Sequence, residues 1–380
     1  MREIENRISL NQNLTSDISL PTSHITKMLL SKLTIQKELL LGKTLSELKR
    51  IASEIGLPAF VASQIAYWLY KTNIQSFDEM TNISKNARLL LAEKFDFGVV
   101  ASVKVQQSLD GTKKYLYPVG SNKFIETAYI PDEKRNTLCV SSQVGCKMGC
   151  LFCATGRQGF QAQLSAGQIL NQLRSLPEKE SVTNTVFMGM GEPFDNLEAV
   201  MNAQEILTAE YGFNLSVRKV TVSTIGIVPA MEVFIRESKC NLAVSLHSPF
   251  DDERRRLMPI QHVFPIKDVI ETISKADLGK YRRVSIEYIV FGGLNDTPKH
   301  VKELARILNK IRCRINLIRF HPVPNVPLPP TDEARLLEFQ QALTAKGIVT
   351  TIRTSRGLDI DAACGLLSTK AIVKNENPDY

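Results

Sequence analysis

The chain has 380 residues, of which 43% are hydrophobic and 23% are charged, and its formal net charge is +8. This composition is typical of a soluble globular protein with two or three domains, or with one barrel and an added module. No stretch is long and apolar enough to span a bilayer, and the charged, polar start lacks a secretory apolar region. We therefore expect a cytoplasmic protein, in which seven cysteines favour metal binding or catalysis over disulfides.

The excess of basic residues is compatible with an RNA substrate but does not demonstrate one. Short basic clusters are candidate phosphate contacts, although such clusters more often lie on a solvated surface. The candidates are Lys113–Lys114, Arg254–Arg256, Arg282–Arg283, and Arg353 with Arg356.

A small helical domain is predicted near the N-terminus, after a polar tail. Thr44 and Glu47 have the spacing of a capping box, which opens a helix that Gly56 ends. Apolar periodicity predicts a second helix from Pro58 and a third over 82–95.

The next segment alternates between apolar and polar residues, which is typical of strands. Two such stretches, 99–106 and 114–119, flank Asp110 and Gly111. An Asp-Gly pair between alternating stretches is a strong signal for a β-hairpin.

From Asn136 onward, predicted strands and helices follow one another in about six β-α units. This order favours an α/β fold in which a parallel sheet is wound into a partial (β/α)6 barrel, with the active site in loops at the carboxyl ends of the strands. The predicted strands are 137–144, 183–188, 219–223, 241–246, 284–290, 315–320 and 349–354, and the predicted helices are 165–176, 197–210, 229–237, 265–276, 299–310 and 331–345. The predicted domains are a polar tail (1–35), a helical accessory domain (36–97), a β-hairpin linker (98–132), the barrel (133–370) and a C-terminal tail (371–380).

Three cysteines follow the first predicted barrel strand in a C-x3-C-x2-C spacing, Cys146, Cys150 and Cys153. Three thiolates can hold three irons of a four-iron cluster and leave the fourth iron open. An open iron can bind S-adenosylmethionine and pass an electron to its sulfonium, and the spacing resembles the signature of the radical SAM superfamily. The alternative is a structural zinc site that includes Cys139, although zinc sites favour two C-x2-C pairs with a longer insert.

Polar groups also follow the later strands. Gly191 and Glu192 follow the second strand, and a carboxylate there could pair with the ammonium of a bound methionyl group. Ser223 follows the third strand and offers a hydroxyl for ribose contacts. The fourth strand ends at Ser245–His247, where His247 is as often a structural histidine as a functional one.

The remaining cysteines fall into two kinds. Cys139 lies on the first predicted barrel strand, and Cys364 lies in a loop bracketed by Gly357 and Gly365 that can reach the mouth of the barrel. Cys240 and Cys313 precede strands and are interpreted as buried packing residues.

Together these segments resemble the RlmN family, radical SAM methyltransferases that methylate C2 of adenine in 23S rRNA and in some tRNAs. The resemblance covers residues 40–370 and includes two cysteines that radical SAM proteins in general lack. The matching segments are Cys139–Phe160, Gly189–Pro193, Thr221–Gly226, Leu242–His247 and Asp359–Gly365.

The resemblance implies a division of labour among five cysteines. Adenine C2 is electron-poor and does not attack a sulfonium methyl, whereas a thiolate can. Cys364 is therefore expected to take a methyl group from one S-adenosylmethionine, and a second one on the [4Fe–4S] cluster of the C-x3-C-x2-C run supplies a radical that activates this methyl. Cys139 is expected to form a transient disulfide with Cys364 and so release the product.

The resemblance also implies further site residues and partners. Glu126 matches a proposed proton acceptor, although a Glu in an alternating strand usually faces solvent. His321 stands where the family usually has Asn. The expected partners are 23S rRNA, tRNA and an electron donor such as flavodoxin, with no membrane and a monomeric chain. The expected cofactor contacts are Gly191, Glu192, Ser223, Ser245, Leu246, His247 and His321.

Two other functions are compatible with the sequence. A Cfr-type enzyme methylates C8 of the same adenine with the same cysteine pair, and the longer N-terminal module and Arg157–Phe160 favour C2. A zinc-stabilised RNA-binding protein without catalysis leaves Cys364 and the polar strand-end loops unexplained.

Overall fold

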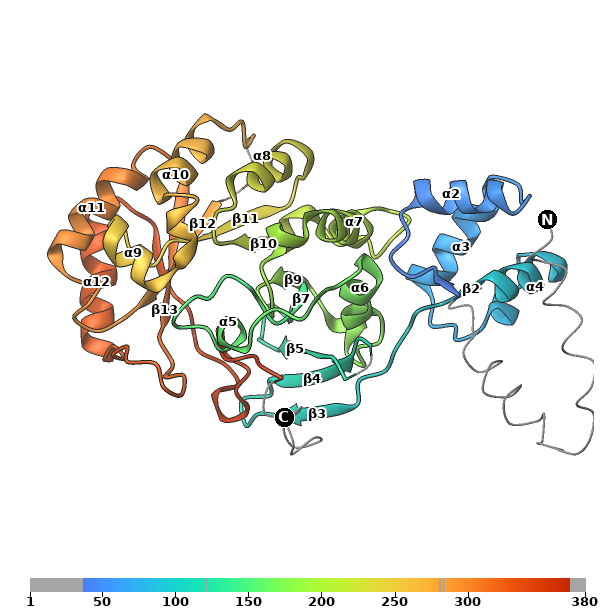
Figure 1. Ribbon diagram of the computed structural model, residues 1–380, viewed down its shortest axis with the longest axis horizontal. Coiled ribbons are helices and arrows are strands. Elements are labelled where there is room, and N and C mark those ends of the chain that lie inside the picture. The colour runs from blue at the N-terminus through green and yellow to red at the C-terminus, as the bar shows by residue number, and fades with distance from the viewer. Residues whose placement is uncertain (1–36, 121, 280–281, 283, 370–380) are drawn as a thin grey trace, which may run out of the picture. The chain divides into compact units, whose positions relative to one another are not determined.

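The computed structural model describes residues 37–120, 122–279, 282 and 284–369 (Figure 1). The two predicted tails therefore lie outside the described residues. The chain divides into two units, 1–38 and 39–380, and the second contains every helix described and every strand after β1 (Glu38–Leu39).

The helical domain consists of three helices, as predicted. The capping box at the start of the first helix is confirmed, because the Thr44 side chain accepts from the Glu47 backbone and Glu47 Oε2 accepts from Thr44 N at 2.7 Å. Gly56 follows the helix with a φ of +73°. The elements are α2 (Leu45–Glu54), α3 (Phe60–Lys71), α4 (Lys85–Lys94) and the short strand β2 (Phe95–Asp96).

One ten-stranded sheet forms the rest of the fold, with strand order β14-β13-β12-β11-β10-β9-β6-β5-β4-β3. The seven strands from β6 to β14 in this order are parallel, and the sheet is not closed, because β14 and β3 lie at its two ends. The predicted partial barrel is thereby confirmed. The parallel strands are β6 (Thr137–Cys139), β9 (Asn184–Phe187), β10 (Val220–Thr224), β11 (Asn241–Ser245), β12 (Val284–Val290), β13 (Cys313–Arg319) and β14 (Thr350–Ile352).

Helices between the parallel strands lie along the outside of the sheet (Figure 1). Their apolar faces join the outward side chains of the strands in one core. Within the described part of the chain, no helix is long and apolar enough to cross a membrane. The helices are α5 (Ala154–Gln158), α6 (Ala166–Arg174), α7 (Leu197–Thr208), α8 (Val228–Glu237), α9 (Asp251–Leu257), α10 (Ile266–Lys275), α11 (Pro298–Leu308) and α12 (Glu333–Ala345).

The first predicted barrel strand, 137–144, is wrong in its extent. The chain leaves β6 after Cys139, and the backbone N–H of Ser142 donates to the carbonyl of Met190 in the loop that follows β9. A separate two-stranded sheet then forms from β7 (Gln143–Val144) and β8 (Ala162–Gln163). The short helices α5 and α9 were not predicted, because five and seven residues are too few to show a helical period.

The predicted β-hairpin is confirmed and is part of the barrel sheet. Strands β3 (Lys104–Gln107) and β4 (Lys113–Pro118) pair across the turn at Asp110 and Gly111, where Gly111 has a φ of +85°. The next strand, β5 (Phe124–Ile130), pairs antiparallel with both β4 and β6. The hairpin therefore extends the edge of the barrel on the side of Cys139.

The inner face of the barrel is polar along much of its length. In β12 the side chains of Ser285 and Glu287 line a cavity, whereas the alternate residues Ile286 and Tyr288 are fully buried in the core. The interior of a closed eight-stranded barrel is usually filled by bulky branched side chains. Here, polar inward residues and an open sheet leave a space in which chemistry can take place.

Arg174 joins α6 to the helical domain through buried hydrogen bonds. Its Nε donates to the carbonyl of Leu69 at 3.0 Å and its Nη2 to that of Ile74 at 3.2 Å. Arg174→Met leaves two buried carbonyls unpaired, so we expect the free energy of unfolding to fall by roughly 3 kcal/mol in urea denaturation. The matched variant Arg50→Met removes an exposed ion pair with Glu54 and should change stability little. Equal effects of the two variants would contradict a structural role for Arg174.

Candidate active site

Two cavities meet inside the barrel. The upper cavity lies at the carboxyl ends of the strands and is lined by the three clustered cysteines and by Glu192, Ser223, Ser245 and His247. The lower cavity has a volume of about 1020 Å³ and reaches the amino ends of the strands. The residues that line both cavities are Met188, Glu287, Ile318, Arg353, Cys364 and Leu367.

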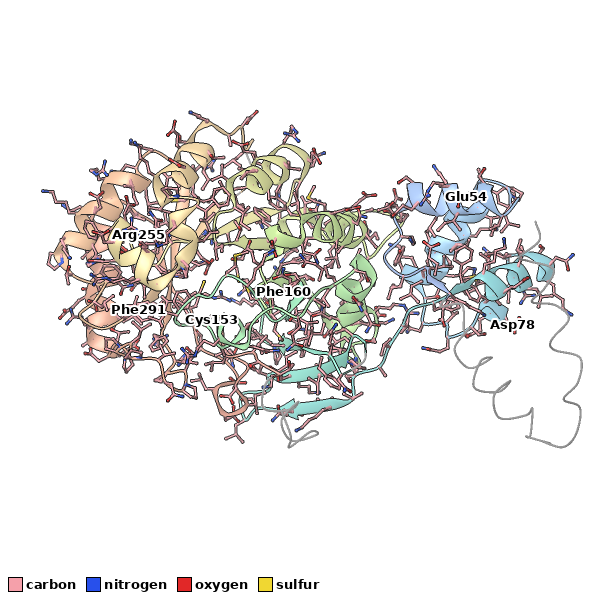
Figure 2. The ribbon with its side chains drawn as sticks, viewed as in Figure 1. Glu54, Asp78, Cys153, Phe160, Arg255 and Phe291 are labelled. Atoms are coloured by element: carbon pink, nitrogen blue, oxygen red, sulfur yellow. The ribbon has the colours of Figure 1, made fainter. Side chains whose placement is uncertain are left out.

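The three clustered cysteines lie on the loop between β7 and α5, and Cys153 directly precedes α5 (Figure 2). This loop starts at Gly145, whose φ is +70° and whose position leaves no room for a Cβ, because that atom would lie 1.7 Å from the carbonyl oxygen of Gly159. Burial raises the pKa of Cys146 to about 12 and also raises the pKa values of Cys150 and Cys153. A metal centre offsets this cost, because it binds the thiolate form.

The arrangement of these thiols does not support the zinc alternative. Zinc draws four ligands onto one ion, whereas an iron–sulfur cluster separates its thiolates onto different irons. Cys139, the fourth thiol of the zinc alternative, lines the lower cavity and not the upper one.

Glu192 is a buried carboxylate in the wall of the upper cavity. Its Oε1 accepts from the Thr224 hydroxyl at 2.6 Å and its Oε2 accepts from Ile225 N at 3.1 Å. Burial raises the pKa of Glu192 to about 7, although these hydrogen bonds act in the opposite direction. Because the Glu192 carboxylate is costly to ionise by itself, the positive charge of a ligand ammonium beside it would stabilise its ionised form.

His247 has a structural and a cavity-lining role. It adopts a left-handed backbone conformation with a φ of +58°, and its Nδ1 accepts from Ile289 N at 3.0 Å. Burial and the nearby Arg254 lower the pKa of His247 to about 3, so the ring is neutral and its proton is on Nε2. His247 also packs edge-to-face on Phe152, next to the cysteine loop.

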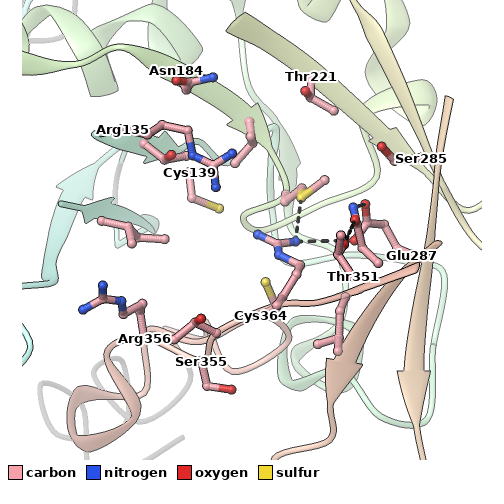
Figure 3. Close-up of a pocket in the computed structure, with 18 of the residues that line it drawn as sticks. Arg135, Cys139, Asn184, Thr221, Ser285, Glu287, Thr351, Ser355, Arg356 and Cys364 are labelled. Atoms are coloured by element: carbon pink, nitrogen blue, oxygen red, sulfur yellow. Dashed lines mark hydrogen bonds and ion pairs between the residues drawn. The ribbon is translucent and has the colours of Figure 1, made fainter. Parts of the chain in front are cut away.

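Cys139 and Cys364 both point into the lower cavity, from β6 and from the loop that follows β14 (Figure 3). All seven cysteines are free thiols, so these two are not joined. The guanidinium of Arg353 lies near both, and the proximity of Cys364 is the main cause that raises the pKa of Arg353. Burial raises the pKa of Cys139 to about 12, against the opposing effect of Arg353.

The loop that carries Cys364 is fixed at both ends. At its start, Asp110 Oδ2 in the hairpin turn accepts from Gly357 N at 2.8 Å, and Ser108 donates to Asp359. At its end, Ala154 N donates to the carbonyl of Gly365 at 2.8 Å. The loop is therefore tied both to the hairpin and to α5, the helix that follows the cysteine cluster.

Glu126 on β5 is buried rather than solvent-facing, which corrects the expectation from strand alternation. Lys114 Nζ lies 3.0 Å from its Oε1, and Ser368 N donates to its Oε2 at 2.9 Å. Burial raises the pKa of Glu126, and the Lys114 ammonium partly offsets this. Glu126 is absent from the lining of both cavities and lies behind the end of the Cys364 loop.

The structure separates the expected cofactor contacts into two groups. Gly191, Glu192, Ser223, Ser245 and His247 all line the upper cavity. Leu246 is fully buried and does not line it, and His321 lines the lower cavity, with its Nε2 2.8 Å from Ser355 Oγ. The geometry therefore gives no support to cofactor contacts by the side chains of Leu246 and His321.

Most of the basic clusters that were candidate phosphate contacts have internal partners. Lys113 Nζ lies 2.6 Å from Glu178, and Lys114 pairs with Glu126. The fully buried Arg254 donates to the carbonyls of Ile225 and Leu246, at the ends of β10 and β11. Arg282 donates to three carbonyls, those of Phe234, Ile235 and Cys240, Arg356 pairs with Asp132, and Arg283 lies outside the described residues.

Two polar residues of the barrel interior were missed in the sequence. Glu287 accepts from Asn316 Nδ2 at 2.8 Å and pairs with Arg353 at 3.5 Å (Figure 3). Glu287 could have been found, because a charged residue within the mainly apolar strand Val284–Val290 needs a buried partner. The role of Asn316 depends on the pairing of β12 with β13 and has no local signal.

An open α/β barrel with three clustered thiols at the carboxyl ends of its strands defines a radical SAM enzyme, and the comparisons agree. Residues 140–308 match the Radical SAM superfamily model, and residues 39–96 match the model of the ribosomal RNA large subunit methyltransferase N-terminal domain. A solved radical SAM methyltransferase from Sphaerobacter thermophilus superposes with a TM-score of 0.81 at 40% identity, covering 87% of this chain and 99% of that one.

Similar sequences identify the family. A protein of Parabacteroides distasonis is 55% identical over 88% of this chain and 98% of its own length, and is named "Probable dual-specificity RNA methyltransferase RlmN". A protein of Syntrophus aciditrophicus, named "Dual-specificity RNA methyltransferase RlmN", is 41% identical over 87% and 96%. The chain belongs to the RlmN family of radical SAM methyltransferases.

The family implies a [4Fe–4S] cluster and S-adenosylmethionine, and the upper cavity fits both. Three thiols, which burial makes costly to ionise alone, share this cavity with a buried carboxylate and two serine hydroxyls. Soft sulfur ligands match iron, and the oxygen groups match the amino and ribose groups of S-adenosylmethionine.

Glu192 should make the stability of the cofactor-free protein depend on pH. Its folded pKa is raised to about 7 from 4.5, so its protonated form stabilises the fold fully below pH 4.5, and this contribution declines as the pH rises to about 7. We expect the free energy of unfolding of the parent protein, relative to Glu192→Gln, to fall over this window by at most about 1.4 kcal/mol per pH unit. Urea denaturation at several pH values measures this difference. The control variant is Glu232→Gln, which changes an exposed carboxylate on α8. If the free energy of unfolding of the parent protein and of Glu192→Gln changes with pH in the same way, the effect is refuted.

Proposed function

We propose that this enzyme methylates C2 of an adenine in 23S rRNA and in tRNA, by way of a methyl group carried on Cys364. The observation that carries the proposal is that Cys364 lines both cavities, whereas the clustered cysteines line the upper cavity and Cys139 lines the lower one. A thiol at the junction can accept a methyl group on one side and present it to a base on the other. The names of the similar proteins support an RNA substrate.

In the first step the Cys364 thiolate attacks the methyl carbon of S-adenosylmethionine, and the carbon–sulfonium bond breaks to leave S-adenosylhomocysteine. Arg353 lies beside Cys364, and this proximity is the main cause that raises the pKa of Arg353, so the guanidinium stays charged next to the reacting sulfur. Glu287 pairs with Arg353 at 3.5 Å and thereby helps to hold the guanidinium in place. The product is S-methylcysteine at residue 364.

The cluster, when bound to a second S-adenosylmethionine, supplies the radical chemistry that removes a hydrogen atom from this methyl group. Cys146, Cys150 and Cys153 would hold the cluster. Gly191, Glu192, Ser223, Ser245 and His247 would hold S-adenosylmethionine, with the Glu192 carboxylate on its ammonium. Cys364 would then hold the activated carbon against adenine C2 in the lower cavity.

Release of the product requires a second thiol. After the carbon–carbon bond has formed, the adduct radical would lose the C2 hydrogen as a proton and give one electron back, for which the cluster held by Cys146, Cys150 and Cys153 would be the acceptor. The Cys139 thiolate then attacks the sulfur of Cys364, the carbon–sulfur bond breaks, and the exocyclic carbon takes up a proton to become the methyl group. The positions of Cys139 and Cys364 in one cavity support this disulfide exchange (Figure 3).

Glu126 is proposed as the acceptor of the C2 proton. Its raised pKa suits a base that must take up a proton near neutral pH. Lys114 and Ser368 now hold it behind the Cys364 loop, so the role requires the end of this loop to move.

The disulfide between Cys139 and Cys364 must be reduced after each turnover. We infer that the enzyme receives electrons from a donor such as flavodoxin. We also infer that it is monomeric and works in the cytoplasm.

The proposal predicts 2-methyladenosine as the product and Cys364 as the carrier of the methyl group. RNA digested after reaction with the reconstituted enzyme should show 2-methyladenosine by mass spectrometry, and 8-methyladenosine would identify the Cfr-type reaction instead. Cys364→Ala should abolish methylation while it retains iron and sulfide, because Cys364 is not one of the clustered thiols. Normal turnover by this variant would refute the carrier role. The control Cys313→Ala changes a half-buried cysteine at the start of β13 that lines neither cavity.

Replacement of Cys139 should trap the intermediate, because no thiol remains to attack Cys364. We expect Cys139→Ala to accumulate protein covalently bound to RNA, visible as a shifted band in denaturing gels and sensitive to ribonuclease. Cys240→Ala, another buried cysteine outside both cavities, should release methylated RNA as the parent enzyme does. If Cys139→Ala yields only free RNA, its resolving role is wrong.

A further inference from the structure

The lower cavity opens at the amino ends of the parallel strands, opposite to the cysteine cluster. Arg218 and Lys219 directly precede β10, Arg312 directly precedes β13, and Arg314 is its second residue. All four line the lower cavity, as does Arg135 just before β6. We call these five residues the basic rim.

The lining of this cavity carries a large excess of positive charge. It contains seven arginine or lysine side chains and two carboxylates, Asp132 and Glu287. Each carboxylate forms an ion pair with an arginine that does not belong to the rim. Asp132 pairs with Arg356 at 3.7 Å, and Glu287 pairs with Arg353 at 3.5 Å. The lining therefore has five more basic side chains than carboxylates.

The rim stands at the entrance, and not at the reacting end, of the cavity. At roughly 3.3 Å per residue, β13 rises about 13 Å from Arg314 to Ile318, which is one of the residues where the two cavities meet. The uncharged polar side chains of Asn316 and Thr351, which pair in register, lie in this interval, and Ser285 lies at the level of Arg314. A ligand that reaches Cys364 along this path has its anionic part at the rim and a neutral polar part inside.

We propose that the basic rim is the RNA entrance of this enzyme: it binds the backbone phosphates that flank the target nucleotide, whose base enters the lower cavity from the amino ends of the strands. This inference rests on the proposed function and adds the direction of approach and the residues that contact the backbone. Five cations around an opening match consecutive phosphates, and a polar tunnel matches the edges of a base.

This geometry also defines the form of the RNA. A base stacked within a duplex cannot extend along a cavity on the order of 13 Å deep, so the target must be unpaired or turned out of its stack. Phosphate contacts carry no sequence information, so the rim contributes affinity, while selection of the base takes place inside the cavity.

The test is the salt dependence of RNA binding by the full chain with its reconstituted cluster. The probe is an RNA stem-loop with an unpaired adenine, and the variants are Arg312→Gln with Arg314→Gln, and separately Arg218→Gln with Lys219→Gln. Each phosphate contact to a single strand contributes about 0.7 to the slope of log K against log salt, so each double variant should lower the slope by about 1.4. The affinity lost between about 50 and 200 mM salt should then be about sevenfold smaller than in the parent protein.

The control removes the same charge elsewhere. Lys267→Gln with Lys302→Gln changes exposed lysines on the outer helices α10 and α11 and should leave the slope unchanged. Arg312→Lys with Arg314→Lys keeps the charge and should keep the slope. Iron content and the unfolding midpoint show whether each variant is folded, and in methylation assays the rim variants should raise KM more than they lower kcat.

The outcomes separate this inference from the proposed function. If the parent enzyme methylates RNA but both folded rim pairs bind it with the parent slope and KM, the RNA enters elsewhere and the inference is wrong. If the parent enzyme binds and methylates no RNA at all, the proposed function fails first. If the control pair lowers the slope as much as the rim pairs do, the effect is one of net charge and the rim is not a site.

Discussion

The position of Cys364 is the constraint on which the rest of the site depends, because one thiol has to face two cavities. Its loop is held by the hairpin through Asp110 and by α5 through Ala154, so neither attachment belongs to the parallel strands. The antiparallel strands at the edge of the sheet therefore help to position Cys364 although they carry none of the clustered cysteines. A loop fixed at both ends keeps the sulfur at the junction without filling either space.

Burial sets the charge state of most groups around this thiol. Glu192 and His247 are fully enclosed, and desolvation moves the pKa of each toward its neutral form. Arg353 remains a cation between Cys139, Cys364 and Glu287, since these partners raise its pKa. The wall of the upper cavity thus has neutral Glu192 and His247 side chains in the absence of a ligand. The Arg353 guanidinium lies beside the sulfurs of Cys139 and Cys364. Farther along the lower cavity, the charge becomes strongly positive at the rim.

The sequence predicted the fold well where the spacing of apolar residues or a turn motif identifies an element. The alternation of strands and helices from residue 136 and the Asp110–Gly111 hairpin are both confirmed, because each depends on residues that are neighbours in the chain. The prediction was wrong for 137–144, where hydrogen bonds to the loop after β9 take the chain out of the sheet. The expectation that the Glu126 side chain faces solvent was also wrong, because strand alternation alone does not tell which face the Cys364 loop covers.

The sequence by itself determined the cluster of thiols and the family, because these follow from residue types in short motifs, and it singled out Cys139 and Cys364 as two further candidate site residues. Only the tertiary structure decided which cavity each of them faces. It also showed that Lys114, Arg254 and Arg282 have internal partners. It placed Arg218, Lys219, Arg312 and Arg314 together at the mouth of the lower cavity. Arg218 and Lys219 are about 94 residues from Arg312 and Arg314 in the chain, and the pairing of parallel strands brings the two pairs to one end of the sheet. Sequence spacing does not show this, because backbone hydrogen bonds in the sheet join strands that are distant in the chain.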